Sequence, residues 1–144
     1  MLKLFISGTG KMIDLPDKVK KILVDIEYDT EILIGDCYGV DYLVQNFIAG
    51  YRPDLKVTVY ASGNKHRNVM SDEFAVKYIP VPDNITGRAF YTEKDKAMIT
   101  DCDIAFAVWD GKSAGTGNNI RMLKSLGKPV YIYHTGLDKL LRSK

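Results

Sequence analysis

The stretch 103–119, DIAFAVWDGKSAGTGNN, constrains the fold of this chain more than any other part of it. It begins with the apolar run 104–108, which has the length of a buried strand. A loop rich in Gly, Ser, Thr and Asn follows, and then Ile120, Leu123 and Leu126 recur at helical spacing. The order strand, glycine loop, helix places unpaired N–H groups and the positive end of the helix dipole beside the loop. Such an arrangement favours a bound phosphate or another anion.

Strand-like and helix-like segments alternate along the rest of the chain. Strands are expected at residues 2–7, 31–34, 56–61, 103–108 and 129–134, and 75–81 fits a short strand that its prolines would limit to an edge. Five helices are expected. The first lies at about 19–26 with Asp14 as its cap, the second at 40–48, and the third runs from a capping box of Thr92 and Asp95 through residue 100. The fourth follows the glycine loop, and the fifth runs from Thr135 through Leu141. This alternation predicts a Rossmann-like α/β domain, with a mostly parallel sheet of about five strands and helices on both faces.

Length and composition indicate a single domain of an ordinary globular protein. The chain has 144 residues, of which 46% are hydrophobic, and a formal charge of +2 with no block of like charges. We therefore expect no nucleic-acid partner, since a basic face is the minimum footprint of one. No segment reaches the roughly 20 apolar residues that cross a bilayer, so no membrane association is expected either.

Cysteine and histidine usage predicts a cytoplasmic protein without a metal. Cys37 and Cys102 form no C-x-x-C motif, which favours reduced thiols. The two histidines, His66 and His134, stand apart, so a zinc site is not expected. No cofactor is expected.

Three glycine-bearing loops, 8–10, 35–39 and 111–117, follow predicted strands. If the first strand lies beside the fourth, 103–108, these loops gather at one edge of the sheet. Ligands of such sheets bind beyond the carboxyl ends of the strands, where the strand order reverses. The loops complete neither a dinucleotide fingerprint nor a Walker A motif, so a full NAD(P) site and ATP hydrolysis of the Walker type are disfavoured.

Several side chains near these loops allow two interpretations. Asp36 could hold a ribose hydroxyl. Asp41 either complements the dipole of the helix that begins at about residue 40 or grips a sugar hydroxyl. Trp109 either stacks on a base or seals the edge of the core. Cys37 has no identifiable base beside it and is interpreted as a bystander.

The turn at 35–41, GDCYGVD, resembles the G-x-x-x-G-x-D turn of the SLOG superfamily, the Rossmann-like domains related to the DprA/Smf and LOG proteins. Three segments in the second half of the chain also resemble this family. Residues 94–98 together with 102–103 resemble its R-D-x-x-M helix and the strand that follows, and residues 110–116 resemble its d-G-x-S-x-G-T loop. Residues 127–130 resemble the g-k-P-V segment that leads into its last strand. The resemblance covers nearly the whole chain except about 62–90. It is strongest for the small stand-alone bacterial and phage proteins related to YspA and YpsA.

This resemblance implies a nucleotide or nucleotide-derived ligand, such as a nucleoside phosphate or an ADP-ribose-like molecule, and a homodimer or larger homo-oligomer. Some relatives cleave the bond between base and sugar with a Glu that follows the G-T of the glycine loop. Here Gly117, Asn118 and Asn119 occupy that region, and an amide cannot act as a carboxylate nucleophile or base. Lys94 stands where the family has an Arg, which removes bidentate phosphate recognition.

The leading hypothesis is one nucleotide-binding domain, 1–144, with backbone groups of the loops on phosphate, carboxylates on ribose and polar side chains supplying further hydrogen bonds. The candidate ligand-binding residues are Gly8, Thr9, Gly10, Gly35, Asp36, Gly39, Asp41, Asp95, Trp109, Ser113, Gly115, Thr116, Gly117, Asn118 and Asn119. One alternative is an N-glycosidic hydrolase or transferase in which Asp41 or Asp95 replaces the missing Glu. The other is a regulatory interaction protein with a vestigial pocket.

Overall fold

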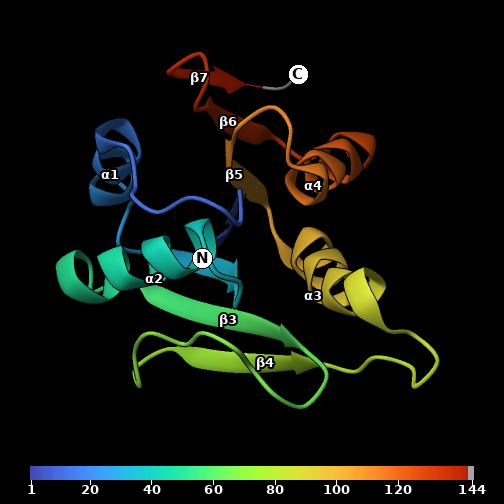
Figure 1. Cartoon of the computed structure of the whole chain (residues 1–144). Coiled ribbons are helices and arrows are strands. Elements are labelled where there is room, and N and C mark those ends of the chain that lie inside the picture. The colour runs from blue at the N-terminus through green and yellow to red at the C-terminus, as the bar shows by residue number, and fades with distance from the viewer. Residues whose placement is uncertain (143–144) are drawn as a thin grey trace.

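The computed structural model describes residues 1–142, which form one seven-stranded sheet and four helices (Figure 1). The strands are β1 (Leu2–Gly8), β2 (Thr30–Gly35), β3 (Lys56–Ser62), β4 (Ala75–Ile79), β5 (Ile104–Trp109), β6 (Val130–His134) and β7 (Lys139–Arg142). The helices are α1 (Asp17–Val24), α2 (Val40–Tyr51), α3 (Gly87–Asp101) and α4 (Ala114–Ser125). Within the described residues, no helix is long and apolar enough to cross a membrane.

The sheet has the order β4-β3-β2-β1-β5-β6-β7, and every neighbouring pair is parallel except β6 and β7. Helices α1 and α2 lie on one face and α3 and α4 on the other (Figure 1). The Rossmann-like α/β class is therefore confirmed. The condition on which the gathering of the glycine loops depended, that the first strand lies beside the strand at 103–108, is met, because Ser7 and Gly8 of β1 pair with Ala107 and Val108 of β5. The strand order reverses between β1 and β5, so the loops after these strands meet at one edge.

The core has one layer on each side of the sheet because the central strands are buried on both faces, which explains their continuous apolar runs. Ile6 and Ile34 pack in the layer that contains Val44 of α2. Phe5 packs in the opposite layer with Met98 of α3.

The sheet has seven strands where about five were predicted. At one edge, β4 is the short edge strand that residues 75–81 were expected to allow, and at the other edge β7 was not expected. The expected C-terminal helix from Thr135 is wrong, because β7 pairs antiparallel with β6 there. Leu137, Leu140 and Leu141 have helical spacing, yet all three are exposed. Asp138 adopts a φ of 50°, and this left-handed residue reverses the chain before β7.

The predicted helix starts also need correction. Asp14 is not the cap of α1, since Pro16 occupies the N-cap position and no side chain caps the helix. Thr92 does not begin α3, because this helix starts at Gly87. The Thr92 hydroxyl instead donates to the Arg88 carbonyl inside the helix. The glycine loop after β5 is shorter than predicted, because α4 begins at Ala114 and takes the following glycines into its first turns.

Candidate functional site

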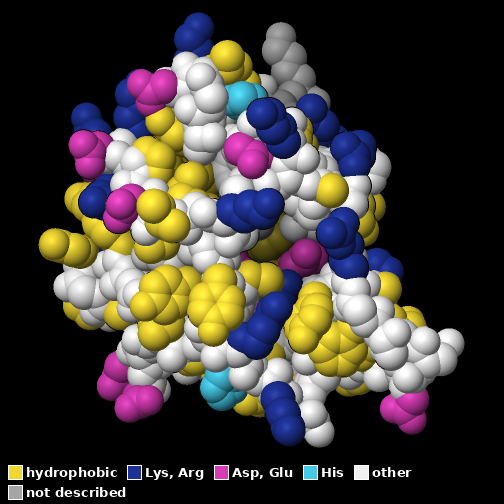
Figure 2. Space-filling view, viewed as in Figure 1, with side chains coloured by type: hydrophobic (Ala, Val, Ile, Leu, Met, Phe, Trp, Pro, Cys, Tyr) yellow, Lys and Arg dark blue, Asp and Glu magenta, His cyan; other side chains and the backbone are white. Residues whose placement is uncertain are grey.

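A pocket of about 170 Å³ opens at the carboxyl edge of the sheet, around the ends of β1 and β2, the middle of α3 and the first turns of α4. It is lined by Phe5, Ser7, Gly8, Gly10, Gly35, Cys37, Asp41, Lys94, Asp95, Met98, Ser113, Gly115, Thr116 and Asn119. We call it the central pocket. Figure 2 shows a hollow on this side of the molecule, with an acidic side chain inside it and Lys and Arg side chains around it.

Most of the candidate ligand-binding residues come together in the central pocket. Gly8, Gly10, Gly35, Asp41, Asp95, Ser113, Gly115, Thr116 and Asn119 line it. Thr9, Asp36, Gly39, Trp109, Gly117 and Asn118 do not line it. The role of each residue toward a ligand stays a prediction.

Close backbone contacts hold the glycine loops together. Thr9 donates its N–H to the Val108 carbonyl at 3.0 Å, and its own carbonyl accepts the N–H of Val40 at 3.2 Å. Gly39 has a φ of 76°, and a Cβ there would stand 2.5 Å from the Thr9 oxygen. A Cβ at Gly8 would likewise stand 2.6 Å from the Val108 oxygen. Thr9 and Gly39 therefore serve the packing of the loops, which fixes the pocket wall before any ligand arrives.

Asp41 is a buried carboxyl group in the pocket wall. It is 7% exposed, and its Oδ2 accepts the N–H of Cys37 at 3.2 Å. Burial raises the pKa of Asp41 to about 7; Lys94 opposes this rise and Asp95 adds to it. Near neutral pH this carboxyl can therefore either donate or accept a proton.

Lys94 supplies the cation of the pocket and is absent from the candidate ligand-binding residues that the sequence suggested. Its Nζ donates to Asp95 Oδ1 at 3.0 Å and to the Tyr91 carbonyl at 3.2 Å, and its side chain is 3% exposed. Burial lowers the pKa of Lys94, but the neighbouring Asp95, Cys37 and Asp41 outweigh burial and raise it above its usual value. The sequence offered a signal, because the resemblance to the SLOG superfamily places an Arg at the position of Lys94, but the change to Lys was interpreted only as a loss of phosphate recognition.

The first turns of α4 bring polar groups to the other side of the pocket. Asp110 holds this turn by accepting the N–H groups of Lys112 at 2.8 Å and Ser113 at 2.7 Å. These bonds lower the pKa of Asp110. The Ser113 hydroxyl lies 3.3 Å from Thr9 Oγ1, and the Asn119 amide donates to Asp95 Oδ2 at 3.4 Å. The N-terminus of α4 therefore faces the pocket together with hydroxyl and amide groups.

Three candidate residues have other partners. Asp36 is 2% exposed and accepts the N–H and the guanidinium of Arg67 at 2.8 and 2.9 Å. Trp109 donates its indole N–H to the Ser113 carbonyl at 3.0 Å and packs edge-on against His134, which favours the packing interpretation. Asn118 is exposed and accepts a hydrogen bond from Arg121.

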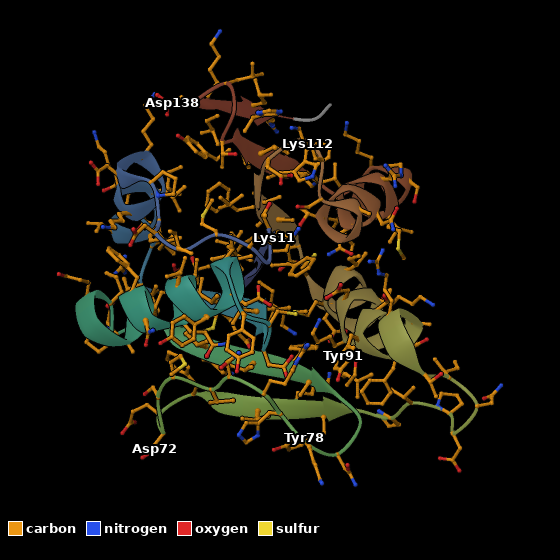
Figure 3. The ribbon with its side chains drawn as sticks, in the orientation of Figure 1. Lys11, Asp72, Tyr78, Tyr91, Lys112 and Asp138 are labelled. Carbon is orange, nitrogen blue, oxygen red and sulfur yellow. The ribbon has the colours of Figure 1, made fainter. Side chains whose placement is uncertain are left out.

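Arg67 adds an unexpected basic and aromatic element to the rim. Its guanidinium donates to Asp36 and to Cys37 Sγ and lies 4.1 Å from the ring centroid of Tyr91. In Figure 3, Lys11 lies near the middle of the view, with Lys112 on one side of it and Tyr91 on the other. A guanidinium and an aromatic ring thus lie beside Cys37 at the edge of the pocket, although the loop that carries Arg67 has no recognisable motif.

Comparison with known proteins supports the fold. No protein family model matches the chain, and no curated protein matches it by sequence. Among solved structures, it is similar to DNA processing protein A from Helicobacter pylori, a single-stranded DNA binding protein, with a TM-score of 0.65 and 17% identity. The alignment covers 91% of this chain and 64% of that chain, so this chain spans less than two thirds of its neighbour's length.

This finding contradicts the expectation that nucleic acid is excluded as a partner. That expectation rested on a net charge of +2, which is a sum over the whole surface and does not report how charges are distributed. Lys and Arg side chains surround the hollow in Figure 2, so a small net charge coexists with a locally basic rim. The comparison shows for this chain a Rossmann-like fold of the kind found in DNA processing protein A.

Proposed function

We propose that the central pocket binds the sugar-phosphate part of a nucleotide, either a free nucleotide or one unit of single-stranded DNA. One observation carries the proposal: the buried Lys94 ammonium, the N-terminus of α4 and two glycine loops converge on a single pocket that also contains the carboxyl groups of Asp41 and Asp95. The volume of about 170 Å³ is below the roughly 300–1,000 Å³ of sites that enclose a drug-sized ligand. The base therefore lies outside the pocket.

The charges divide the pocket between phosphate and sugar. A phosphate is favoured beside Gly115 and Thr116, where helix N–H groups without helical partners and the helix dipole attract an anion. The carboxyl groups of Asp41 and Asp95 would repel a phosphate but accept hydrogen bonds from sugar hydroxyls. Lys94 compensates these carboxyl groups and adds attraction for the phosphate.

The bound sugar phosphate could belong to a free nucleotide or to a single strand of DNA. The resemblance of the sequence 1–144 to SLOG domains, and to their YspA/YpsA-like branch in particular, supports a free cytoplasmic nucleotide. The structural likeness to a single-stranded DNA binding protein and the basic, aromatic rim support a strand. Both sources place a sugar phosphate in the same pocket.

Calorimetric titration with thymidine monophosphate, adenosine monophosphate and a ten-residue thymidine oligonucleotide tests the proposal. Gly115 lines the pocket and a Cβ there would meet no atom within 4 Å, so we expect Gly115→Val to add bulk at the pocket while the fold is kept. Gly50 of α2 is equally open and lies outside the pocket, so Gly50→Val is the matched control. We expect Gly115→Val to weaken binding at least tenfold and Gly50→Val to leave it unchanged.

The same titrations separate the two sources. If a monophosphate binds strongly and the oligonucleotide binds no more tightly, the ligand is a free nucleotide. If the oligonucleotide binds much more tightly than the monophosphate, the ligand is a single strand of DNA. Equal affinities for wild type and Gly115→Val, or no binding of any probe, would contradict the proposal.

A second candidate function is cleavage or transfer at the N-glycosidic bond. The observation that favours it is the buried Asp41 carboxyl, whose pKa of about 7 suits a general acid or base. Chromatography after incubation with nucleoside monophosphates would reveal free base. We expect release by wild type but not by Asp41→Asn if this activity exists; intact substrate with wild type would exclude it for the nucleotides tested.

A further inference from the structure

A second cavity, of about 540 Å³, lies at the carboxyl ends of β3 and β4 beside the first turns of α3. It is lined by Gly63, Asn64, Tyr78, Pro80, Val81, Asp83 and Phe90. We call it the outer cavity. It belongs to the part of the chain, about 62–90, that matches no family motif.

Aromatic and cationic groups form a continuous path from the central pocket to the outer cavity. Cys37 lines the central pocket and accepts a hydrogen bond from Arg67 at 3.1 Å. The Arg67 guanidinium lies 4.1 Å from the centroid of Tyr91, and the Tyr91 ring lies 5.1 Å from that of Phe90, nearly perpendicular to it. Phe90 is a wall of the outer cavity. Flat apolar surface and one guanidinium therefore bridge the two cavities.

We infer that the outer cavity holds the base adjacent to the nucleotide in the central pocket, which makes the ligand a single strand of DNA. The inference rests on the proposed function and names its ligand. Phe90 and Tyr78 supply aromatic surface on which a base can stack in a sequence-tolerant way. Asn64 and Asp83 supply polar groups for the edge of the base. Arg67 is placed between the cavities, where the linking phosphate would pass.

The Phe90 ring is held in position by the backbone of Gly63. Gly63 has a φ of 81°, and a Cβ there would stand 2.7 Å from the tip of the ring. The Gly63 N–H donates to the carbonyl of Ile79, which joins this turn to the end of β4. The cavity wall is thus built by contacts within the protein and needs no ligand to form.

The test compares the affinity of thymidine monophosphate with that of oligonucleotides of two, four and ten thymidines, for wild type, Phe90→Ala and Tyr78→Ala. Tyr78 is a 44% exposed residue of the edge strand β4, so its variant guards against a folding defect of Phe90→Ala. Tyr28→Ala is the control, because Tyr28 is 75% exposed and lines neither cavity. We expect each cavity variant to weaken oligonucleotide binding about tenfold while monophosphate affinity is kept.

Two failures are distinguishable. If wild type binds no monophosphate, or Gly115→Val does not weaken that binding, the proposed function fails. If monophosphate binding is normal but oligonucleotides gain nothing over it, or Phe90→Ala and Tyr78→Ala bind them as tightly as wild type, the outer cavity does not hold a base.

Discussion

The ammonium of Lys94 lies 3.0 Å from the carboxylate of Asp95, its neighbour in the sequence, in the wall of the central pocket. The Lys94 side chain is 3% exposed and that of Asp95 is 21% exposed. Asp41, on a different helix, is the other carboxyl group of the same wall. A single buried cation thus compensates the acidic groups of the pocket, so we expect Lys94 to contribute to stability and, under the proposed function, to nucleotide binding.

Replacing Lys94 with methionine should lower both the stability of the protein and its affinity for a nucleotide. Lys94→Met keeps the apolar stem but leaves Asp95 without its cation, and breaking a buried pair in this way costs about 3 kcal/mol. We expect a loss of this size in urea unfolding and at least a tenfold loss of nucleotide affinity. The control is Lys96→Met on the same helix, because Lys96 is 54% exposed and its pairing with Glu93 contributes less than about 1 kcal/mol. Equal behaviour of the two variants would contradict the role assigned to Lys94.

The buried Asp41 should make the free energy of unfolding depend on pH. Its pKa is about 7 in the folded protein against an ordinary value of 3.8, so the folded state binds more protons than the unfolded state between these values. This contribution to stability is therefore present at low pH and is lost as pH rises from about 4 to about 7. Asp41→Asn removes the titration, so between pH 5 and pH 8.5 wild type should lose about 3 kcal/mol more than the variant.

Urea unfolding at several pH values measures this difference. Parallel stability curves for wild type and Asp41→Asn would show that the Asp41 carboxyl is not held in a protonated state by burial.

Gly39 should tolerate no side chain, because its backbone lies against the loop after β1. Gly39→Ala adds a Cβ 2.5 Å from the Thr9 oxygen and requires a φ of 76°. We expect a loss of stability of about 1–3 kcal/mol from backbone strain and steric conflict. Gly50→Ala, inside α2 with nothing within 4 Å, should instead add about 0.5–1 kcal/mol. Thermal unfolding of both variants measures this, and similar shifts of the same sign would be inconsistent with the loop packing.

Arg67 should stabilise the loop between β3 and β4 through Asp36. Arg67→Ala leaves the nearly buried Asp36 carboxylate with the Arg67 backbone N–H but without the guanidinium, at a cost of about 1–3 kcal/mol. In Asp36→Asn the carboxylate is absent, so Arg67→Ala in that background should cost much less. A double-mutant cycle by urea unfolding tests this coupling. Strict additivity of the two substitutions would mean that the ion pair contributes nothing.

Local pattern predicted the elements around the pocket because those elements are specified by neighbouring residues. The apolar run 104–108 and the helical spacing of Ile120 and Leu123 indicated β5 and α4. The sequence analysis could only assume that the strand with Ser7 lies beside the strand with Ala107, and the structure shows that they pair. The same reasoning failed at the C-terminus, where Leu137 and Leu141 have helical spacing but antiparallel pairing with β6 decides the structure.

The remaining parts of the site depend on contacts between distant residues. Arg67 meets Asp36 and Tyr91 only after β3 and α3 have packed, and no local pattern announces either contact. The outer cavity likewise joins Gly63, Tyr78 and Phe90 from three separate segments. The sequence motif contained Lys94, but only the structure shows that its side chain is buried and compensates the charge of Asp95.

The most direct test of the central claim is a two-dimensional ¹H–¹⁵N NMR titration of the protein with thymidine monophosphate. The account predicts that amide shifts concentrate on Gly8, Gly10, Gly35, Gly115 and Thr116, which line the central pocket. It also predicts little change at Gly50 and Tyr28, which lie outside that pocket. Shifts centred elsewhere on the protein, or an unchanged spectrum at millimolar ligand, would contradict nucleotide binding in this pocket.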